Sequence, residues 1–164
     1  GVSKGFAMTG WRIGYIGAAK EIAWACEKIQ GQFTSGTSSI SQRAVIAALN
    51  SDMGPTYEMR NAFLRRRDII LNELSKIPGL KFNKPQGAFY VFPDVSYFFG
   101  KRNGDYIINN ANDLCLYLLN RVYVAVVPGE AFGNPNYMRI SYAANDEIII
   151  EAINRISKAL NELK

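Results

Sequence analysis

The chain has 164 residues, of which 48% are hydrophobic and 20% charged, which is typical of a folded globular domain rather than of a disordered chain. Its formal net charge is +5, but the basic runs Arg65–Arg67 and Lys101–Arg102 lack the interleaved aromatic residues of a nucleic-acid platform, so we interpret them as solvated helix faces. The absence of histidine excludes catalysis by an imidazole of this chain, and no apolar run approaches the roughly 20 residues that span a membrane.

The first informative segment is Ser3–Tyr15, which reads S-K-G-F-A-M-T-G-W-R-I-G-Y. It contains one lysine, Lys4, and one arginine, Arg12, with glycines between and after them. A lysine amine in partly desolvated surroundings loses its proton readily and can then bond a carbonyl carbon, and an arginine fork suits a phosphate. The two side chains therefore fit a carbonyl cofactor that carries a phosphate, whereas the spacing alone also fits a turn with two surface cations.

The sequence of this segment closely resembles the lysine segment of class I and II aminotransferases, which depend on pyridoxal 5'-phosphate (PLP). The nearest match is the bacterial aspartate aminotransferase subgroup, whose segment reads S-K-x-(F/Y)-A-M-T-G-W-R-(I/V)-G-Y. The resemblance implies that Lys4 bonds the cofactor aldehyde, that Arg12 binds its phosphate, and that Ser3 lies beside that phosphate. In the family a large cofactor-binding portion precedes this lysine, so the resemblance also implies that the chain is the C-terminal part of a longer enzyme.

The next two elements are predicted to be a strand and a helix. Residues 12–18 alternate glycine with bulky side chains, which predicts a short buried strand that other backbones approach closely. Apolar residues at helical spacing predict a helix over residues 19–30, which Gly31 ends. Cys26 lies on the apolar stripe of this helix, and Cys115 also has apolar neighbours. Neither cysteine has metal-ligand spacing, so we expect two buried free thiols in a reducing cytoplasm.

A small polar loop, residues 34–39, separates this helix from the next one. The loop is either a connector or, as the resemblance implies, a segment that reaches the active site of the neighbouring subunit in a homodimer. Residues 40–49 are rich in alanine and predict a helix, with Ser39 or Ser41 as its N-cap.

The clearest interruption of the chain is S-D-M-G-P at residues 51–55. Pro55 suits the first turn of a helix, and an apolar stripe follows until about Lys76, before Pro78 and a glycine stop it. This helix is long enough to bridge two lobes. We therefore predict that residues 1–53 end a large PLP-binding domain and that residues 54–164 form a small C-terminal domain.

The small domain is predicted to be an α/β sandwich of about four strands with helices packed on the sheet. The predicted strands are residues 80–83, 88–92, 122–127 and 137–142, with the first two forming an antiparallel hairpin. The G-A-F-Y that opens the second strand resembles the corresponding strand of the family. Together these elements predict the C-terminal part of a type I PLP-dependent transferase fold.

Two helices complete this domain. The first is expected over residues 112–120, with Asn112 as its cap and with inward-facing side chains at Leu114, Leu118 and Leu119. The second begins after Asn145 or Asp146 and carries a sustained apolar stripe, formed by Ile149, Ile153, Ile156, Leu160 and Leu163.

One further residue is a candidate for binding substrate. V-P-G-E-A-F-G, followed closely by R-I-S-Y-A, resembles a family signature in which Arg139 binds the α-carboxylate of the substrate. A guanidinium fork can bind a carboxylate with two parallel hydrogen bonds, which agrees with that role, whereas an arginine on a strand without this match would suggest a surface position. Asn134–Asn136 departs from the glycine that relatives often have there, and a turn tolerates the change.

The function implied by the resemblance is transfer of an amino group between an amino acid and a 2-oxo acid. Two alternatives stay open: a PLP-dependent β-lyase on the same fold, and the aminotransferase-like sensor domain of a transcription regulator. We expect the chain alone to fold at least from residue 54 onward without catalysing transamination.

Overall fold

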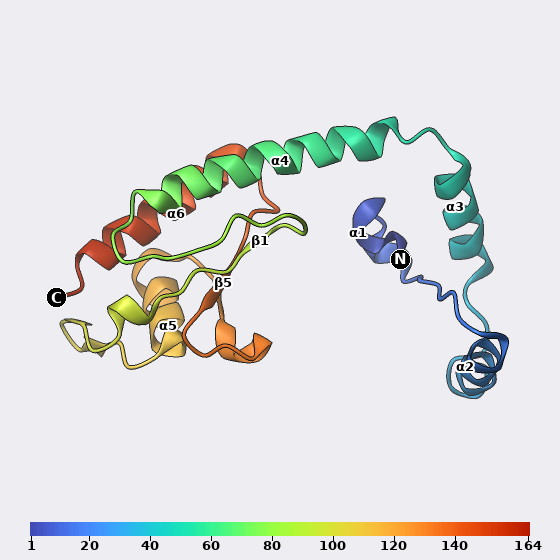
Figure 1. Cartoon of the computed structure of the whole chain (residues 1–164), viewed down its shortest axis with the longest axis horizontal. Helices are drawn as coiled ribbons and strands as arrows, with labels where there is room; N and C mark the ends of the chain where they lie inside the picture. Colours follow the sequence, from blue (N-terminus) through green and yellow to red (C-terminus); the bar gives the residue numbers. More distant parts are fainter. The chain divides into compact units, whose positions relative to one another are not determined.

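The long helix α4 (Gly54–Ser75) joins two parts of the chain (Figure 1). In this computed structural model, which describes residues 1–164, the chain divides into unit 1, Gly1–Met59, and unit 2, Arg60–Lys164. The long helix predicted to start at Pro55 is present and begins one residue earlier, at Gly54. The two units divide inside α4, and the domain boundary predicted at its first residue stays a prediction. No helix combines the length and apolarity needed to cross a membrane.

Unit 1 contains helices and connecting segments but no strand. Its elements are α1 (Val2–Gly5), the 3-10 turn η1 (Thr9–Trp11), α2 (Lys20–Phe33) and α3 (Ser39–Asn50). Its buried core consists of Val2, Met8 and Val45, with further apolar residues only partly buried around them. α2 contributes no buried side chain.

Several sequence predictions for unit 1 are wrong. Residues 12–18 form no strand, and an added Cβ at Gly14 or Gly17 would meet nothing within 4 Å. A strand needs a neighbour for its backbone hydrogen bonds, and no segment of this unit pairs with these residues. α2 continues through Gly31, because a glycine weakens a helix by only about 1 kcal/mol and need not end it. Cys26 on α2 is exposed rather than buried.

The start of α3 differs from the prediction by one residue. The cap is Ser38, whose hydroxyl oxygen accepts a hydrogen bond from the Ser41 backbone N–H at 3.5 Å. The predicted cap Ser39 is instead the first helical residue. All three serines are plausible caps by type, so the sequence does not distinguish them.

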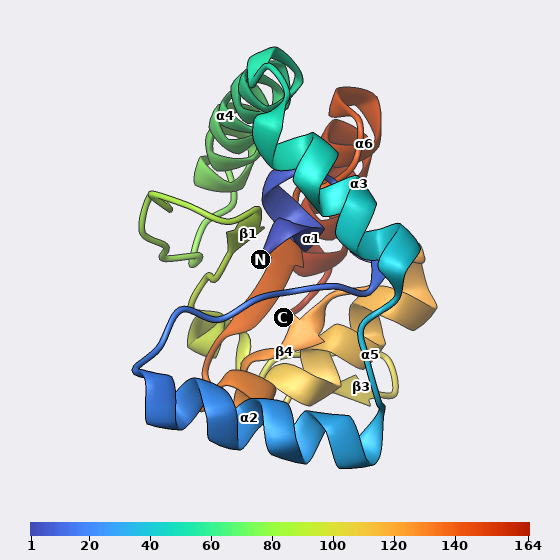
Figure 2. The ribbon, with the colours of Figure 1, turned by 90° about the vertical axis from the view of Figure 1, so that its right-hand side faces the viewer.

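Unit 2 contains a three-stranded antiparallel sheet with strand order β1-β5-β4 (Figures 1 and 2). The strands are β1 (Tyr90–Val91), β4 (Val127–Pro128) and β5 (Met138–Ser141). Tyr90 pairs with Ser141 across β1 and β5, and Val127 pairs with Arg139 across β4 and β5. A separate two-stranded ribbon joins β2 (Arg102–Asn103) to β3 (Tyr106–Ile107).

Three helices supply most of the core against this sheet. They are the unit 2 part of α4, α5 (Ala111–Val122) and α6 (Asp146–Asn161). The predicted apolar stripe, which runs from Ile149 on α6 to Leu163 just after its end, is buried in full. Tyr117 of α5 is fully buried, and its hydroxyl donates to the Ala159 carbonyl of α6 at 3.0 Å. The α/β fold class is therefore confirmed, with two short 3-10 turns, η2 (Ser96–Phe98) and η3 (Gly129–Phe132), between the main elements.

The predicted strands of unit 2 are mostly shorter than expected or absent. Residues 80–83 form only an isolated bridge, from Lys81 to Asp94, so the predicted hairpin with residues 88–92 is wrong. Those residues reduce to β1, which pairs with β5. Residues 122–127 reduce to β4, because α5 extends to Val122 and Tyr123 takes left-handed backbone angles as its C-cap, with φ 58°.

Of the two helix caps predicted in unit 2, that of α6 is confirmed and that of α5 is wrong. Asn145 caps α6 as expected, since its side chain accepts from the Ile148 N–H at 2.8 Å. The cap of α5 is Asn110 rather than Asn112, and Leu119 is exposed rather than inward.

Candidate active site

Lys4 and Ser3 lie on α1, a single helical turn at the start of unit 1. Val2 of this turn is fully buried in the small core, while Ser3 is half-buried and Lys4 is exposed. The backbone after the turn is closed by two hydrogen bonds, from Phe6 N–H to the Val2 carbonyl and from Ala7 N–H to the Lys4 carbonyl, both 3.2 Å. Burial of Val2 therefore anchors the turn that carries the predicted cofactor lysine.

Arg12 ends the 3-10 turn that follows and has left-handed backbone angles, φ 50° and ψ 52°. Its Nη1 donates to the Thr9 carbonyl at 2.7 Å, and the neighbouring Trp11 carbonyl accepts from Ser41 Oγ at 2.9 Å. Ala7 has a positive φ as well, 53°. Two such residues without glycine's freedom within one short segment are typical of loops that are shaped for a ligand.

A hollow lies beside this segment within unit 1. It is lined by Phe6, Ala7 and Met8, and by residues that follow α3 in the sequence, among them Asp52 and Thr56. Ser3, Lys4 and Arg12 do not line it. The hollow therefore adjoins the predicted cofactor segment but is not formed by the predicted cofactor residues.

Arg139 is positioned by the alternation of β5 in unit 2. Met138 and Ile140 point into the core, so Arg139 and Ser141 lie on the other face of the sheet. The guanidinium carbon of Arg139 lies 4.4 Å from the ring centroid of Tyr90 and 4.2 Å from that of Phe132. Arg139 makes no ion pair within the chain, and its side chain has no hydrogen bond there. Its N–H groups are available for an anionic ligand.

The turn between β4 and β5 carries Phe132 and is closed tightly. Gly129 N–H donates to the Tyr137 carbonyl at 2.7 Å, and Asn134 N–H donates to the Gly129 carbonyl at 3.0 Å. A Cβ at Gly129 would lie 2.3 Å from the Asn134 oxygen and 2.5 Å from the Tyr137 oxygen. This position therefore requires glycine because of close backbone approach, and the departure at residues 134–136 is part of the same turn.

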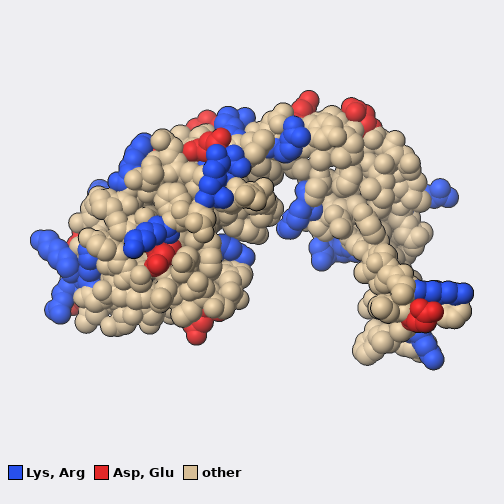
Figure 3. Space-filling model, viewed as in Figure 1, with Lys and Arg blue, Asp and Glu red and all other residues tan.

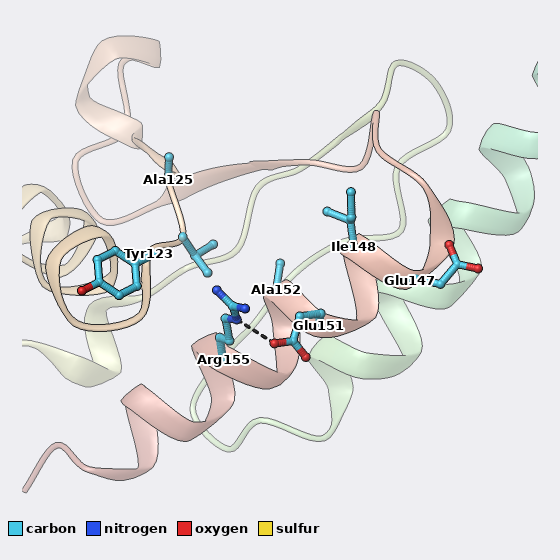
Figure 4. A pocket seen from close by; sticks show the side chains of 8 residues that line it. Tyr123, Ala125, Glu147, Ile148, Glu151, Ala152 and Arg155 are labelled. Atoms are coloured by element: carbon cyan, nitrogen blue, oxygen red, sulfur yellow. Dashed lines mark hydrogen bonds and ion pairs between the residues drawn. The ribbon is translucent and has the colours of Figure 1, made fainter.

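A groove of unit 2 lies between the segment after α5 and the first turns of α6 (Figure 4). Tyr123 and Ile148 are on its walls, and Arg155 Nε donates to Glu151 Oε1 at 2.7 Å beside it. Arg139 does not line this groove. It is open and mostly apolar, and no site residue predicted from the sequence lies there.

Charged side chains on the face shown in Figure 3 are dispersed, with acidic groups among the basic ones. In unit 2, Arg65 Nε donates to Asp146 Oδ2 at 2.8 Å, and Arg66 Nε lies 3.4 Å from Asp146 Oδ1. The hydrogen bond from Arg65 is the main cause that holds the pKa of Asp146 below its ordinary value. Part of the basic run, predicted as a solvated face, therefore connects α4 to the start of α6.

The model of the family "Aminotransferase class I and II" matches residues 1–156 of the chain. The chain belongs to this family. A bifunctional aspartate aminotransferase and glutamate/aspartate-prephenate aminotransferase of Petunia hybrida is 48% identical, over 100% of this chain and 35% of its own length. An aspartate aminotransferase of Rhizobium meliloti (strain 1021) is 46% identical, over 99% of this chain and 40% of its own length.

Solved structures agree with this membership. The crystal structure of the aspartate aminotransferase from Rhizobium meliloti superposes with a TM-score of 0.95 at 45% identity, covering 100% of this chain and 41% of that one. The aspartate aminotransferase from Thermotoga maritima gives 0.84 at 37% identity, covering 98% and 39%. The chain therefore spans roughly two fifths or less of the length of these relatives.

The structure places the predicted residues in two groups, each within its own unit. Ser3, Lys4 and Arg12 lie in one short segment of unit 1, and Arg139 lies on β5 of unit 2. The sequence prediction missed that Tyr90 and Phe132 contact the Arg139 guanidinium. The signal for this contact is weak, because Tyr90 belongs to the predicted strand 88–92 and Phe132 to the V-P-G-E-A-F-G segment, and neither segment indicates which side chain its ring contacts.

Proposed function

We propose that this chain is the C-terminal part of a PLP-dependent aminotransferase of the aspartate type, which transfers an amino group between an amino acid and a 2-oxo acid. The observation that carries the proposal is the segment Ser3–Tyr15, where an exposed lysine on α1 and an arginine with constrained backbone lie within one short stretch of chain. Family membership and the names of its relatives as aspartate aminotransferases support it.

The side chains of this loop fit PLP in their chemistry. The amine of Lys4 would bond the aldehyde carbon, and Arg12 would bind the phosphate with the N–H groups that its bond to Thr9 leaves unused. The hydroxyl of Ser3, one residue away from Lys4, would donate to the same phosphate. When bound, the pyridine ring of PLP supplies an electron sink for the charge that develops at the substrate Cα.

The remaining roles belong to side chains of this chain. Once the substrate amine has displaced it from the aldehyde carbon, the Lys4 amine would act as general base and acid, moving the proton from the substrate Cα to the C4′ carbon of the cofactor and, in the second half of the transfer, back in the opposite direction. Arg139 binds the α-carboxylate with its guanidinium fork, which orients the Cα–H bond for cleavage. Substrate binding at Arg139 and proton transfer at Lys4 are therefore separable by mutation.

The proposal is tested with the full-length protein that contains this chain. The protein is incubated with PLP and reduced with sodium borohydride, and its peptides are then mapped by mass spectrometry. We expect the added phosphopyridoxyl mass on Lys4 and its loss in Lys4→Arg. Lys20→Arg, at an exposed lysine of the same unit, is the matched control and should keep the label. A label that persists on another lysine in Lys4→Arg would refute the assignment.

The reaction type is tested by its products. With L-aspartate and 2-oxoglutarate, a transaminase forms oxaloacetate and glutamate without releasing ammonia, whereas a β-lyase releases ammonia from an amino acid with a leaving group at Cβ. Glutamate formation equal to the aspartate consumed supports the proposal. Ammonia release from an amino acid with such a leaving group, without glutamate formation from L-aspartate, would favour the β-lyase, and PLP binding without either product would favour a sensor domain.

We also propose that the full-length protein is a cytoplasmic homodimer. Support for the dimer comes from Phe33 and Ile40, which flank the polar loop 34–39 and are 83% and 73% exposed, because large exposed apolar side chains are typical of association surfaces. The free thiols Cys26 and Cys115 agree with a reducing compartment. Light scattering after size-exclusion chromatography tests the dimer, and a monomeric mass at micromolar concentration would contradict it.

A further inference from the structure

We propose that Phe132 and Tyr90 are positioning residues, whose rings hold the Arg139 guanidinium so that its N–H groups face a substrate carboxylate. The inference rests on the proposed function, in which Arg139 binds the α-carboxylate of the amino acid. It adds two residues that do not touch the reacting atoms and act through Arg139.

The first support is the way the strands flank Arg139. β5 is the central strand, and Tyr90 comes from β1 on one side of it while Phe132 follows β4 on the other. Both rings lie within 4.4 Å of the guanidinium carbon, yet they make no ring contact with each other. We infer that the guanidinium is held from two sides, by a cation–π contact with each ring.

The second support is that the two rings supply no hydrogen-bond acceptor to the guanidinium. A ring face attracts the cation but leaves the N–H groups in the guanidinium plane available. Arg139 has no carboxylate partner within the chain that would compete for those groups. Rings in place of an acidic partner therefore fix the direction of the fork without lowering its capacity for a carboxylate ligand.

The third support is that both rings are themselves fixed. Phe132 lies on the turn that Gly129 closes, and its ring meets Phe92 edge to face, with centroids 6.1 Å apart. Tyr90 packs on Phe89 with centroids 4.5 Å apart. The Phe132 side chain is 46% exposed, so core packing alone does not explain its place. A ring restrained by such a contact reduces the freedom that the long arginine side chain loses when it binds a ligand.

The test compares substitutions at Phe132 in the full-length protein. Phe132→Leu removes the ring, and Phe132→Tyr retains it. Tyr97→Leu is the matched control, because Tyr97 is a 55% exposed ring of the same unit that contacts a different cation, Lys101, at 4.0 Å. For each variant the steady-state constants with L-aspartate are measured, and the dissociation constant of the unreactive dicarboxylate succinate is measured by calorimetry.

We expect Phe132→Leu to raise the KM for L-aspartate and the Kd for succinate by roughly fivefold, with kcat changed less than about twofold. Phe132→Tyr should restore both values to within about twofold, and Tyr97→Leu should change neither. In an Arg139→Ala background, Phe132→Leu should have no further effect, because the ring then has no guanidinium to hold. Unchanged binding in Phe132→Leu, or an equal loss in both backgrounds, would overturn the inference.

Two controls keep the outcomes distinct. A thermal melt of each variant shows whether it is folded, and Phe132→Met, which keeps apolar volume without a ring, replaces Phe132→Leu if that variant is unstable. If Arg139→Ala leaves L-aspartate and succinate binding unchanged, the proposed role of Arg139 fails. If Arg139→Ala weakens binding measurably and the ring variants change nothing, only the positioning role fails.

Discussion

Among single residues, Arg139 offers the most direct prediction, because its fork geometry matters more than its charge. In the full-length protein, Arg139→Lys should raise the KM for L-aspartate by roughly ten- to a hundredfold, since an ammonium cannot make two parallel hydrogen bonds to a carboxylate. PLP affinity, measured by absorbance titration, should stay within about twofold. Arg121→Lys, at an exposed arginine paired with Glu162, is the control and should change neither value. Equal amino-acid binding by Arg139→Lys and the wild type would contradict the role.

The thiol of Cys115 gives a second prediction at this scale. Burial on α5 raises its pKa to about 11 from an ordinary value of 9.0. Alkylation proceeds through the thiolate, so at pH 8 Cys115 should react roughly a hundredfold more slowly than an ordinary thiol. Because the folded pKa is the higher one, its contribution to stability is present below about pH 9 and is lost as the pH rises toward 11.

The measurement is the alkylation rate of the Cys115 peptide by mass spectrometry from pH 7 to pH 11. In urea, where the chain is unfolded, the alkylation rate of the same peptide should depend on pH as expected for an ordinary thiol pKa, which provides the internal control. A folded-state rate that already levels off near pH 9 would show that burial does not protect this thiol.

The residues of the site could be predicted from the sequence only in part. Four residues lie in specific sequence motifs and could therefore be named: Ser3, Lys4, Arg12 and Arg139. Their roles stay predictions. The rings around Arg139 could not be named, because Tyr90 lies far from it in sequence. A strand's alternation gives the face of each residue but not which residue of the neighbouring strand lies beside it.

Secondary-structure elements differ in how far the sequence predicts them. The helices α4 and α6 agree closely with prediction, because helical hydrogen bonds and caps such as Asn145 are local in sequence. The strands agree poorly. Residues 12–18 have β-type composition but no partner, and most of residues 122–127 is unpaired beside β4. A strand is defined by its neighbour, and the neighbour cannot be read from local composition.

At the η3 turn, the close approach at Gly129 predicts a large loss of stability in Gly129→Ala. The clashing atoms are backbone oxygens, which cannot move without breaking the turn. We expect a loss of about 2–3 kcal/mol in the free energy of unfolding, measured by urea denaturation. Gly87→Ala, where an added Cβ meets nothing within 4 Å, should be nearly neutral. A stable Gly129→Ala with wild-type substrate binding would show that the turn is not needed in this form.

The ion pair at the start of α6 predicts how the stability of the protein depends on pH. The pKa of Asp146 is below its ordinary value, chiefly because Arg65 donates a hydrogen bond to it. For a lowered pKa, the contribution to stability is present above the ordinary value near pH 3.9 and is lost as the pH falls through the folded value. Asp146→Asn should therefore be less stable than the wild type at pH 7 and about equal to it in acid, as measured by urea denaturation at several pH values.

Glu147→Gln is the matched control for this prediction. Glu147 lies in the same first turn of α6 and near the same positive helix end, but it forms no ion pair, and its charge is only a minor cause of the raised pKa of Arg65. Its substitution should leave the difference between neutral and acid stability close to that of the wild type. A stability difference equal to that of Asp146→Asn would assign the effect to the helix end in general rather than to Arg65.

On the scale of the whole molecule, burial is distributed very unevenly between the two units. The core of unit 2 collects side chains from three helices and the sheet, whereas unit 1 has Val2, Met8 and Val45. The sequence predicted buried apolar stripes in both units, because periodicity shows that a face is apolar and not what covers it. The chain spans roughly two fifths or less of its relatives' length. The difference in burial between the two units therefore describes this chain by itself and not its longer relatives.

This difference predicts that the two units of the 164-residue chain differ in local stability. α3 and α5 are a matched pair, because each has 12 residues and a side-chain N-cap. α3 buries only Ser41 and Val45, whereas α5 buries five residues, including the fully buried Leu114 and Tyr117. Since an amide exchanges through openings that break its surrounding contacts, amides of α5 should exchange at least about a hundredfold more slowly than those of α3. Hydrogen exchange followed by mass spectrometry measures both helices in one sample, and equal protection would mean that burial within the chain does not set its local stability.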